Sequence, residues 1–227
     1  MEAKISAVIT ALPYLLAGVG NTAIIVVAAM LIGLVIGVPV AVALVYGPRW
    51  LRVPLAAYLW FFRGVPVLAL LFLFYFGLFT WLEWNIPALA AVALVLGCTT
   101  GAYQANIFRG AILALPPGQF RAASALGMGR WQAIRTIILP QALRLAIPAW
   151  SNEYSIVLKD SALAFVVGAP EIMARTQFVA SRTYQHLPLY IAAGVLYFLL
   201  TWAGVAALRA LERKVRIPGY AAGEQHP

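Results

Sequence analysis

Cysteine and histidine are nearly absent from the sequence, whose 227 residues include one cysteine and two histidines. A single thiol cannot form an internal disulfide, and no spaced set of cysteines and histidines offers a metal site. Cys98 lies in an apolar segment, where a free thiol packs as a small hydrophobic side chain. His186 and His226 stand apart near the end of the chain, which disfavours an enzyme with convergent catalytic groups. We therefore expect no metal ion and no catalytic residue in this chain.

Charged residues are also scarce, at 10% of the chain, whereas 63% of the residues are hydrophobic and the mean hydropathy is +0.90. Such a composition suits helices embedded in lipid. The formal net charge is nevertheless +9. Because the basic residues fall between apolar runs and form no soluble basic domain, we expect contact with an anionic lipid surface and no nucleic-acid partner. The sequence therefore predicts an all-α membrane protein.

Five runs of the sequence are candidates for crossing a bilayer, and they cover about residues 20–46, 55–79, 88–112, 146–167 and 188–208. The first is too long for a secretory signal peptide, so we expect it to be retained. The fourth is unusually polar, and the mixed stretch 168–187 suits short helices. With no internal repeat or linker, the sequence predicts five transmembrane helices in a single domain over residues 1–227.

The basic residues are distributed unevenly between the two ends of these spans. If the long polar stretch between the third and fourth spans is cytoplasmic, only Lys4, Arg175 and Arg182 fall outside. The remaining basic residues of the loops and tail then lie inside: Arg49, Arg52, Arg109, Arg121, Arg130, Arg135, Arg144, Arg209, Arg213, Lys214 and Arg216. The positive-inside rule therefore predicts an external N-terminus and a cytoplasmic C-terminus.

The polar stretch itself covers about residues 116–145. It opens with three residues that break helices, Pro116, Pro117 and Gly118. The pattern then predicts a short helix over 119–126, a turn at Gly127 and Gly129, and a second amphipathic piece over 131–138 that ends at Pro140. Its arginines make it a basic helical hairpin between apolar helices.

This order of residues resembles the EAA loop of ABC importer permeases, in which Glu-Ala-Ala is followed by three residues, then Gly, and then an apolar run ending in Leu-Pro. Ala122, Ala123, Gly127 and the pair Leu139-Pro140 match, whereas Arg121 stands where the family has Glu. In that family the loop forms a coupling helix that docks into a groove of the ATPase. The resemblance implies that Arg121, Ala122, Ala123 and Gly127 contact an ATPase. Residues 116–145 are therefore called the coupling segment.

Two further motifs resemble the polar amino acid branch of these permeases. Residues 62–66, Phe-Arg-Gly-Val-Pro, differ from its Phe-Arg-Gly-Thr-Pro at one position, and Gly64 and Pro66 should interrupt the second span. Residues 101–110 are similar to its Gly-Ala-Tyr-x-Ala-Glu-x-x-Arg-Gly, with Asn106 in place of Glu. Thr99, Tyr103 and Asn106 share one helix face, which should point into the bundle or a wet cavity. Substrate contact and interhelical hydrogen bonding both remain open for this face.

The fourth span carries a second polar face. Asn152, Ser155 and Lys159 recur at helical spacing, with Asp160 beside them. An ionisable group at membrane depth costs about 2.5–3.5 kcal/mol, so Lys159 and Asp160 must pair or line water. We expect an interhelical ion pair first and a place along the substrate path second. Residues 158–163 resemble the same branch's Leu-Lys-Asp-Thr-Ser-Leu.

Taken together, the motifs resemble a type I ABC importer permease of the polar amino acid uptake family, with the MetI-like fold. This resemblance implies an ATPase dimer, a second permease chain, identical or homologous, and an external substrate-binding protein, in a bacterial cytoplasmic membrane. The chain has no Gly-rich phosphate loop, so ATP and Mg belong to the ATPase and this chain needs no cofactor. The alternatives are an importer of another amino-acid-like solute, such as an opine or a compatible solute, and a membrane channel.

Overall fold

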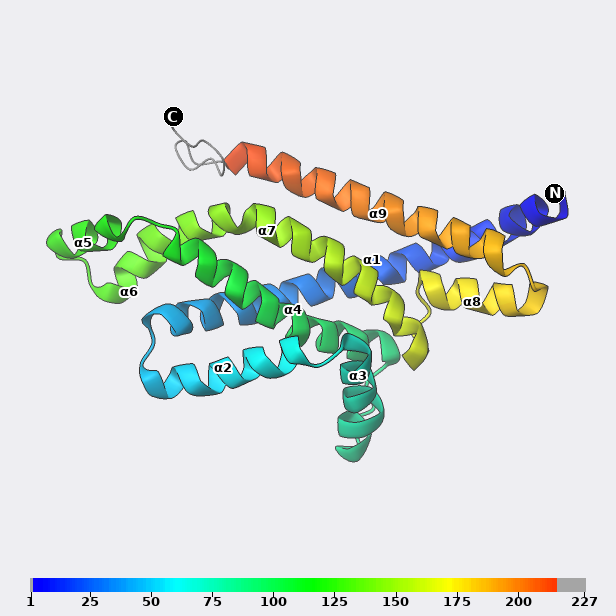
Figure 1. Cartoon of the computed structure of the whole chain (residues 1–227), viewed down its shortest axis with the longest axis horizontal. Coiled ribbons are helices and arrows are strands. Elements are labelled where there is room, and N and C mark those ends of the chain that lie inside the picture. Colours follow the sequence, from blue (N-terminus) through cyan, green and yellow to red (C-terminus); the bar gives the residue numbers. More distant parts are fainter. Residues whose placement is uncertain (1, 216–227) are drawn as a thin grey trace.

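Every regular element in the computed structural model, which describes the chain from residue 2 to residue 215 and its side chains from residue 8, is a helix (Figure 1). The predicted all-α class is confirmed. Four helices are long: α1 (Glu2–Tyr46), α4 (Ala88–Leu113), α7 (Leu139–Asp160) and α9 (His186–Val215). Arg216 and His226 lie outside the described residues, as does the side chain of Lys4.

Three of the described helices are long and apolar enough to cross a membrane, namely Val8–Tyr46, Ala88–Leu113 and His186–Val215. A fourth candidate is a broken span in which α2 (Arg49–Gly64) meets α3 (Val67–Phe72) and the π-helix η1 (Leu73–Phe79) at 107°. Pro66 lies at this break, so the predicted interruption by Gly64 and Pro66 is confirmed. The structure thus supports three or four spans by length and composition and does not confirm the fifth.

The run expected to be the fourth span is divided differently from the prediction. Its helix α7 begins at Leu139 and ends at Asp160, and the 3-10 helix η3 (Ser161–Val167) completes it. Pro140 was expected to end a helix, and this prediction is wrong. It lies in the first turn of α7, directly after the π-helix η2 (Ile134–Ile138). A π-helical stretch accommodates a proline because it rearranges the backbone hydrogen bonds that the missing N–H would disrupt.

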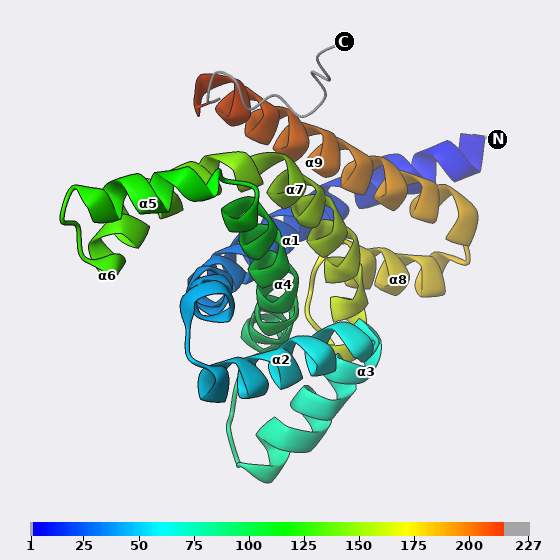
Figure 2. The ribbon, with the colours of Figure 1, turned by 60° about the vertical axis from the view of Figure 1, so that its left-hand side comes forward.

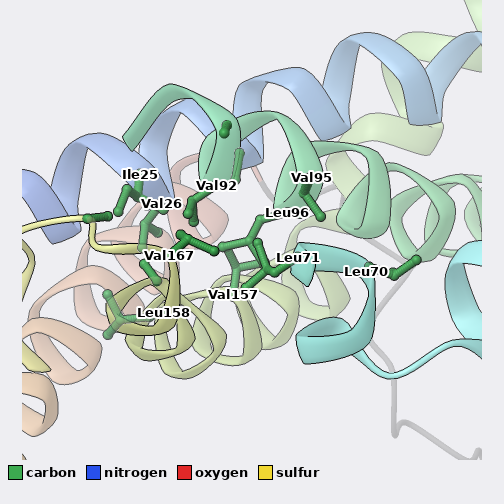
Figure 3. Packing of buried hydrophobic residues seen from close by; sticks show 14 of the residues in the cluster. Ile25, Val26, Leu70, Leu71, Val92, Val95, Leu96, Val157, Leu158 and Val167 are labelled. Atoms are coloured by element: carbon green, nitrogen blue, oxygen red, sulfur yellow. The ribbon is translucent and has the colours of Figure 1, made fainter. Parts of the chain in front are cut away.

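Small residues let α1 and α4 pack closely, and no other two elements pack more extensively. A Cβ atom at Gly97 would lie 2.6 Å from Ile32, and one at Gly37 would lie 2.9 Å from Gln104. Only glycine admits this approach. The apolar core beside it joins α1, α3, α4 and α7, and Figure 3 shows side chains from these helices meeting around Leu96.

Short helices lie at both ends of the bundle. The short helices α5 (Pro117–Ala125) and α6 (Arg130–Ala133) lie at one end, near the turn between α1 and α2, whereas α8 (Ile172–Thr183) lies toward the other end, beside the beginning of α1 (Figures 1 and 2). The mixed stretch 168–187 therefore contains a short helix, as expected.

Glu171 fixes α8 to its neighbours. Its fully buried carboxylate caps the helix by accepting hydrogen bonds from the amides of Met173, at 2.8 Å, and Ala174, at 2.6 Å. It also accepts a hydrogen bond from the Tyr197 hydroxyl of α9. Burial raises the pKa of Glu171, and these hydrogen bonds oppose the rise. On the α1 side, Thr22 accepts a hydrogen bond from the Ile172 amide at 3.3 Å.

Candidate functional site

A chain of hydrogen bonds crosses the middle of the bundle. The indole nitrogen of Trp150 donates to Oε1 of Gln104 at 2.8 Å, and Nε2 of Gln104 donates to the Thr100 hydroxyl at 3.3 Å. The Thr100 hydroxyl donates in turn to the Glu153 carboxylate at 2.6 Å. Gln104 also donates to the backbone carbonyl of Met30, at 3.2 Å. This network, here called the Gln104 network, therefore joins α1, α4 and α7.

The members of the network on α4 are wholly enclosed by protein. Gln104 is 0% exposed and Thr100 is 1% exposed, and Glu153 on α7 is 4% exposed. Among the described side chains no buried polar atom lacks a hydrogen-bond partner. A polar group inside a membrane bundle is tolerated when its hydrogen bonds are satisfied internally. The Gln104 network therefore holds helices together and is closed to substrate in this conformation.

The predicted polar face of α4 lies next to this network and differs from it. Thr99 is buried, and its hydroxyl donates to the Val95 carbonyl of its own helix at 2.9 Å. Tyr103 and Asn106 are half-buried. The Arg63 guanidinium lies 5.2 Å from the centre of the Tyr103 ring, a cation–π distance. The side chains of Thr100 and Gln104, on the adjacent face of α4, make interhelical hydrogen bonds. Among the described residues, the side chains of Tyr103 and Asn106 make none.

The predicted residues of α7 are more exposed than expected. Asn152 and Lys159 are exposed, Asp160 is half-buried, and the Ser155 hydroxyl donates to the Ser151 carbonyl at 3.3 Å. Within residues 8–215 no hydrogen bond joins this set to the predicted face of α4.

We expected Lys159 or Asp160 to form an ion pair with a residue of another helix. The described part of the chain contains no salt bridge from either residue. Lys159 is exposed, and α7 ends at Asp160.

Sequence reasoning did not identify the members of the Gln104 network, Thr100, Gln104, Trp150 and Glu153, as residues that join helices. A signal was present, because Thr100 and Gln104 are four residues apart and so share a helix face. This face is adjacent to the one carrying Thr99 and Tyr103. Only the packing of α1 and α7 on α4 decides which of the two faces turns inward.

The coupling segment forms the helical hairpin that its sequence predicts, with a defined stop after α5. The amide of Met128 bonds to the Ala123 carbonyl at 3.1 Å, and the amide of Gly127 bonds to the Ser124 carbonyl at 3.0 Å. This pair of bonds is the Schellman motif, which requires a left-handed residue, and Gly127 has φ of +76°. The helix begins at Pro117, earlier than the predicted 119, because proline suits the first helical position.

The two alanines of the motif face different ways. Ala123 is 2% exposed, so its small size serves the packing of α5 within this chain. Arg121, Ala122 and Gly127 are exposed. The side-chain amides of Gln119 and Gln141 exchange two hydrogen bonds, of 3.0 and 2.7 Å, which hold α5 against the beginning of α7. The exposed residues therefore lie on a surface whose orientation is fixed by α7.

Comparison with known proteins identifies the family. Residues 29–217 match the model of the binding-protein-dependent transport system inner membrane component. The chain belongs to this family. The permease is 34% identical to a probable amino-acid ABC transporter permease protein of Bacillus subtilis, covering 91% of each chain. It is 36% identical to an octopine transport system permease protein of Rhizobium meliloti, covering 88% of this chain and 89% of the relative.

Three further comparisons extend the likeness. A histidine/lysine/arginine/ornithine permease protein of Salmonella typhimurium is 34% identical, with 88% of this chain and 89% of the relative covered. The crystal structure of an amino acid ABC transporter with histidines superposes with a TM-score of 0.81 at 32% identity, over 91% of this permease and 96% of that chain. An inward-facing methionine ABC transporter, at 23% identity and a TM-score of 0.69 over 88% of this permease and 97% of that chain, shows the shared fold.

The first prediction concerns the Gln104 network. Trp150→Phe keeps an aromatic ring but removes the N–H that satisfies Oε1 of Gln104, and a buried unsatisfied acceptor costs about 1–3 kcal/mol. We expect a lower thermal unfolding midpoint of the purified permease in detergent. Trp202→Phe is the matched control, because Trp202 is 65% exposed on α9. Equal midpoints for the two variants would show that the network does not stabilise the bundle.

Proposed function

We propose that this permease is the transmembrane subunit of an ATP-driven importer that translocates a polar amino acid delivered by an external substrate-binding protein. The observation that carries the proposal is its likeness, over about nine tenths of its length, to permeases named for amino acids. The octopine relative favours one alternative, an importer of an opine or a similar amino-acid-like solute. The exposed residues Arg121, Ala122 and Gly127 are here called the coupling surface. A membrane channel would have no use for such a surface and is the weaker alternative.

The coupling surface would act through α5. In this proposal Arg121, Ala122 and Gly127 contact an ABC ATPase, and Ala123 shapes the hairpin from within. An ATPase dimer would hold ATP and Mg, and a second permease chain would complete the translocation path. Three of the described helices are long and apolar enough to cross the membrane. Five transmembrane segments per chain follow if the broken span formed by α2, α3 and η1 and the polar segment formed by α7 and η3 each cross the membrane once.

The second prediction separates the two alanines. Ala122→Asp places a charge on an exposed position, so we expect it to abolish ATPase co-purification and uptake while the thermal stability of the permease stays unchanged. Ala123→Asp buries a carboxylate, so it should lower the stability of the permease itself. The measurement is pull-down of the ATPase beside a thermal unfolding scan. Normal ATPase recovery with Ala122→Asp would contradict the coupling role of this surface.

The proposed substrate path runs past Tyr103 and Asn106, with Thr99 deeper on the same face and Asn152, Ser155, Lys159 and Asp160 contributed by α7. Arg63 lies over Tyr103, and no carboxylate among the described residues pairs with it. An arginine without an acidic partner suits the carboxylate of an amino acid. Asn106 is neutral where the related pattern has Glu, so this face lacks a counter-charge for a cationic side chain. We propose a preference for zwitterionic or anionic amino acids.

The third prediction tests that preference with two variants whose new side chains are isosteric with each other. Asn106→Glu lengthens the side chain by one methylene and introduces a carboxylate, whereas Asn106→Gln lengthens it equally without a charge. In proteoliposomes containing permease, ATPase and binding protein, we expect the Glu variant to raise lysine or arginine uptake relative to glutamine uptake, and the Gln variant to leave the ratio unchanged. Arginine or lysine as the best substrate of the wild type would refute the charge argument.

The fourth prediction concerns orientation in a bacterial cytoplasmic membrane. Arg49, Arg121 and Arg130 belong to elements at one end of the bundle, whereas Arg175 and Arg182 belong to α8 toward the other end (Figure 1). The positive-inside rule then supports a cytoplasmic C-terminus and an external N-terminus. A C-terminal alkaline phosphatase fusion should be inactive and a C-terminal fluorescent-protein fusion bright. The opposite pair of results would contradict this topology.

A further inference from the structure

A cavity of about 570 Å³ lies between the end of α1 and the stretch that runs from α6 into α7. The α1 side of its wall is almost wholly apolar, with Val38, Pro39, Val42 and Ala43. Ile134 and Leu139 close the opposite side. A volume of this size lies in the range of small-molecule sites, about 300–1,000 Å³. The cavity lies apart from the predicted substrate face and from the exposed residues of α5.

Two arginines lie where α1 ends, one lining this cavity and the other bonded to Gly47, which lines it. Arg130, which lines the cavity, donates to the Tyr46 carbonyl at 2.6 Å and lies 5.8 Å from the centre of the Tyr46 ring. Arg52, from α2, donates to the Gly47 carbonyl at 2.9 Å and to the Val45 carbonyl at 3.2 Å. The carbonyls of three consecutive residues thus bring two guanidinium groups to one place, as the negative end of a helix favours.

The two charges are not neutralised by any carboxylate that the structure describes. Within residues 8–215 no carboxylate lies within 4 Å of Arg52 or Arg130. A guanidinium has five N–H donors, and the hydrogen bonds to carbonyls occupy only part of each set. Both side chains are exposed and keep donors for an anion. Trp131, which also lines the cavity and is 65% exposed, is of the residue type that concentrates at membrane interfaces.

We propose that this cavity binds one anionic phospholipid, with an acyl chain between α1 and η2 and the phosphate on Arg52 and Arg130. The apolar wall matches a hydrocarbon chain, and basic pockets between transmembrane helices on the cytoplasmic side are suited to anionic headgroups. The proposal rests on the orientation given above, which places the α1–α2 turn at the inner leaflet. A bound lipid would hold the residues that follow the turn at Gly127 against α1.

The test is competitive lipid retention by the full-length permease, purified with the proteins that it assembles with. Equal amounts of phosphatidylglycerol and phosphatidylcholine are added in detergent, and bound lipid is counted by native mass spectrometry. We expect the wild-type permease to retain phosphatidylglycerol at least about tenfold better than phosphatidylcholine. The double variant Arg52→Ala/Arg130→Ala should abolish this difference, because the substitutions remove charge-assisted hydrogen bonds to the phosphate. Arg135→Ala is the matched control, since Arg135 is exposed on η2 and does not line the cavity.

A second variant probes the apolar wall. Ala43→Trp fills the cavity and should lower retention of phosphatidylglycerol without removing either arginine. Glycerol phosphate, which has the headgroup chemistry without acyl chains, should not compete with the lipid. Equal retention of the two lipids, unchanged retention in the double variant, or full competition by glycerol phosphate would each overturn the proposal.

The same samples distinguish this proposal from the proposed function. Co-purified ATPase is quantified beside the lipid. Loss of lipid preference with normal ATPase recovery and uptake would support the lipid site as separate from coupling. If the double variant loses ATPase but keeps its lipid preference, the two arginines belong to the ATPase contact and the lipid proposal fails. In neither case does the outcome decide whether the permease imports amino acids.

Discussion

Lipid offers no hydrogen bonds, and this constraint determines how the permease can place polar residues within its bundle. The hydrogen-bond chain from Trp150 through Gln104 and Thr100 to Glu153 meets the constraint by satisfying each group with another. It also links α1, α4 and α7, because Gln104 reaches the Met30 carbonyl. Glycines on α1 and α4 make the close approach possible, so the network and the helix packing depend on each other.

The helix α7 connects the coupling segment to the centre of the bundle. It begins within the coupling segment directly after η2, carries Trp150 and Glu153 through the centre, and leads through η3 toward α8. Glutamine amides fasten α5 to its first turn, and the Gln104 network fastens its middle to α4. The proposed coupling surface on α5 and the predicted substrate face of α4 are therefore both held against α7.

Local features of the sequence were predicted well, whereas contacts between helices were not. The break at Pro66 and the turn at Gly127 follow from backbone chemistry that a single residue imposes. Pro140 was misjudged because the π-helix that accommodates it is not visible in the residue pattern. The inward role of Gln104 depends on which face α4 buries, and periodicity cannot choose between two adjacent polar faces. The same limit applies to Lys159 and Asp160, for which the described residues hold no interhelical salt bridge.

The central claim is that this chain forms a path driven by an ATPase. The most direct measurement is uptake of labelled amino acid into proteoliposomes that contain the permease, its ATPase and its binding protein, with ATP on the ATPase side. The account predicts accumulation against a gradient that requires ATP and stops when the binding protein is omitted. Equilibration of the amino acid by the permease alone, without ATP or ATPase, would contradict it and show a channel.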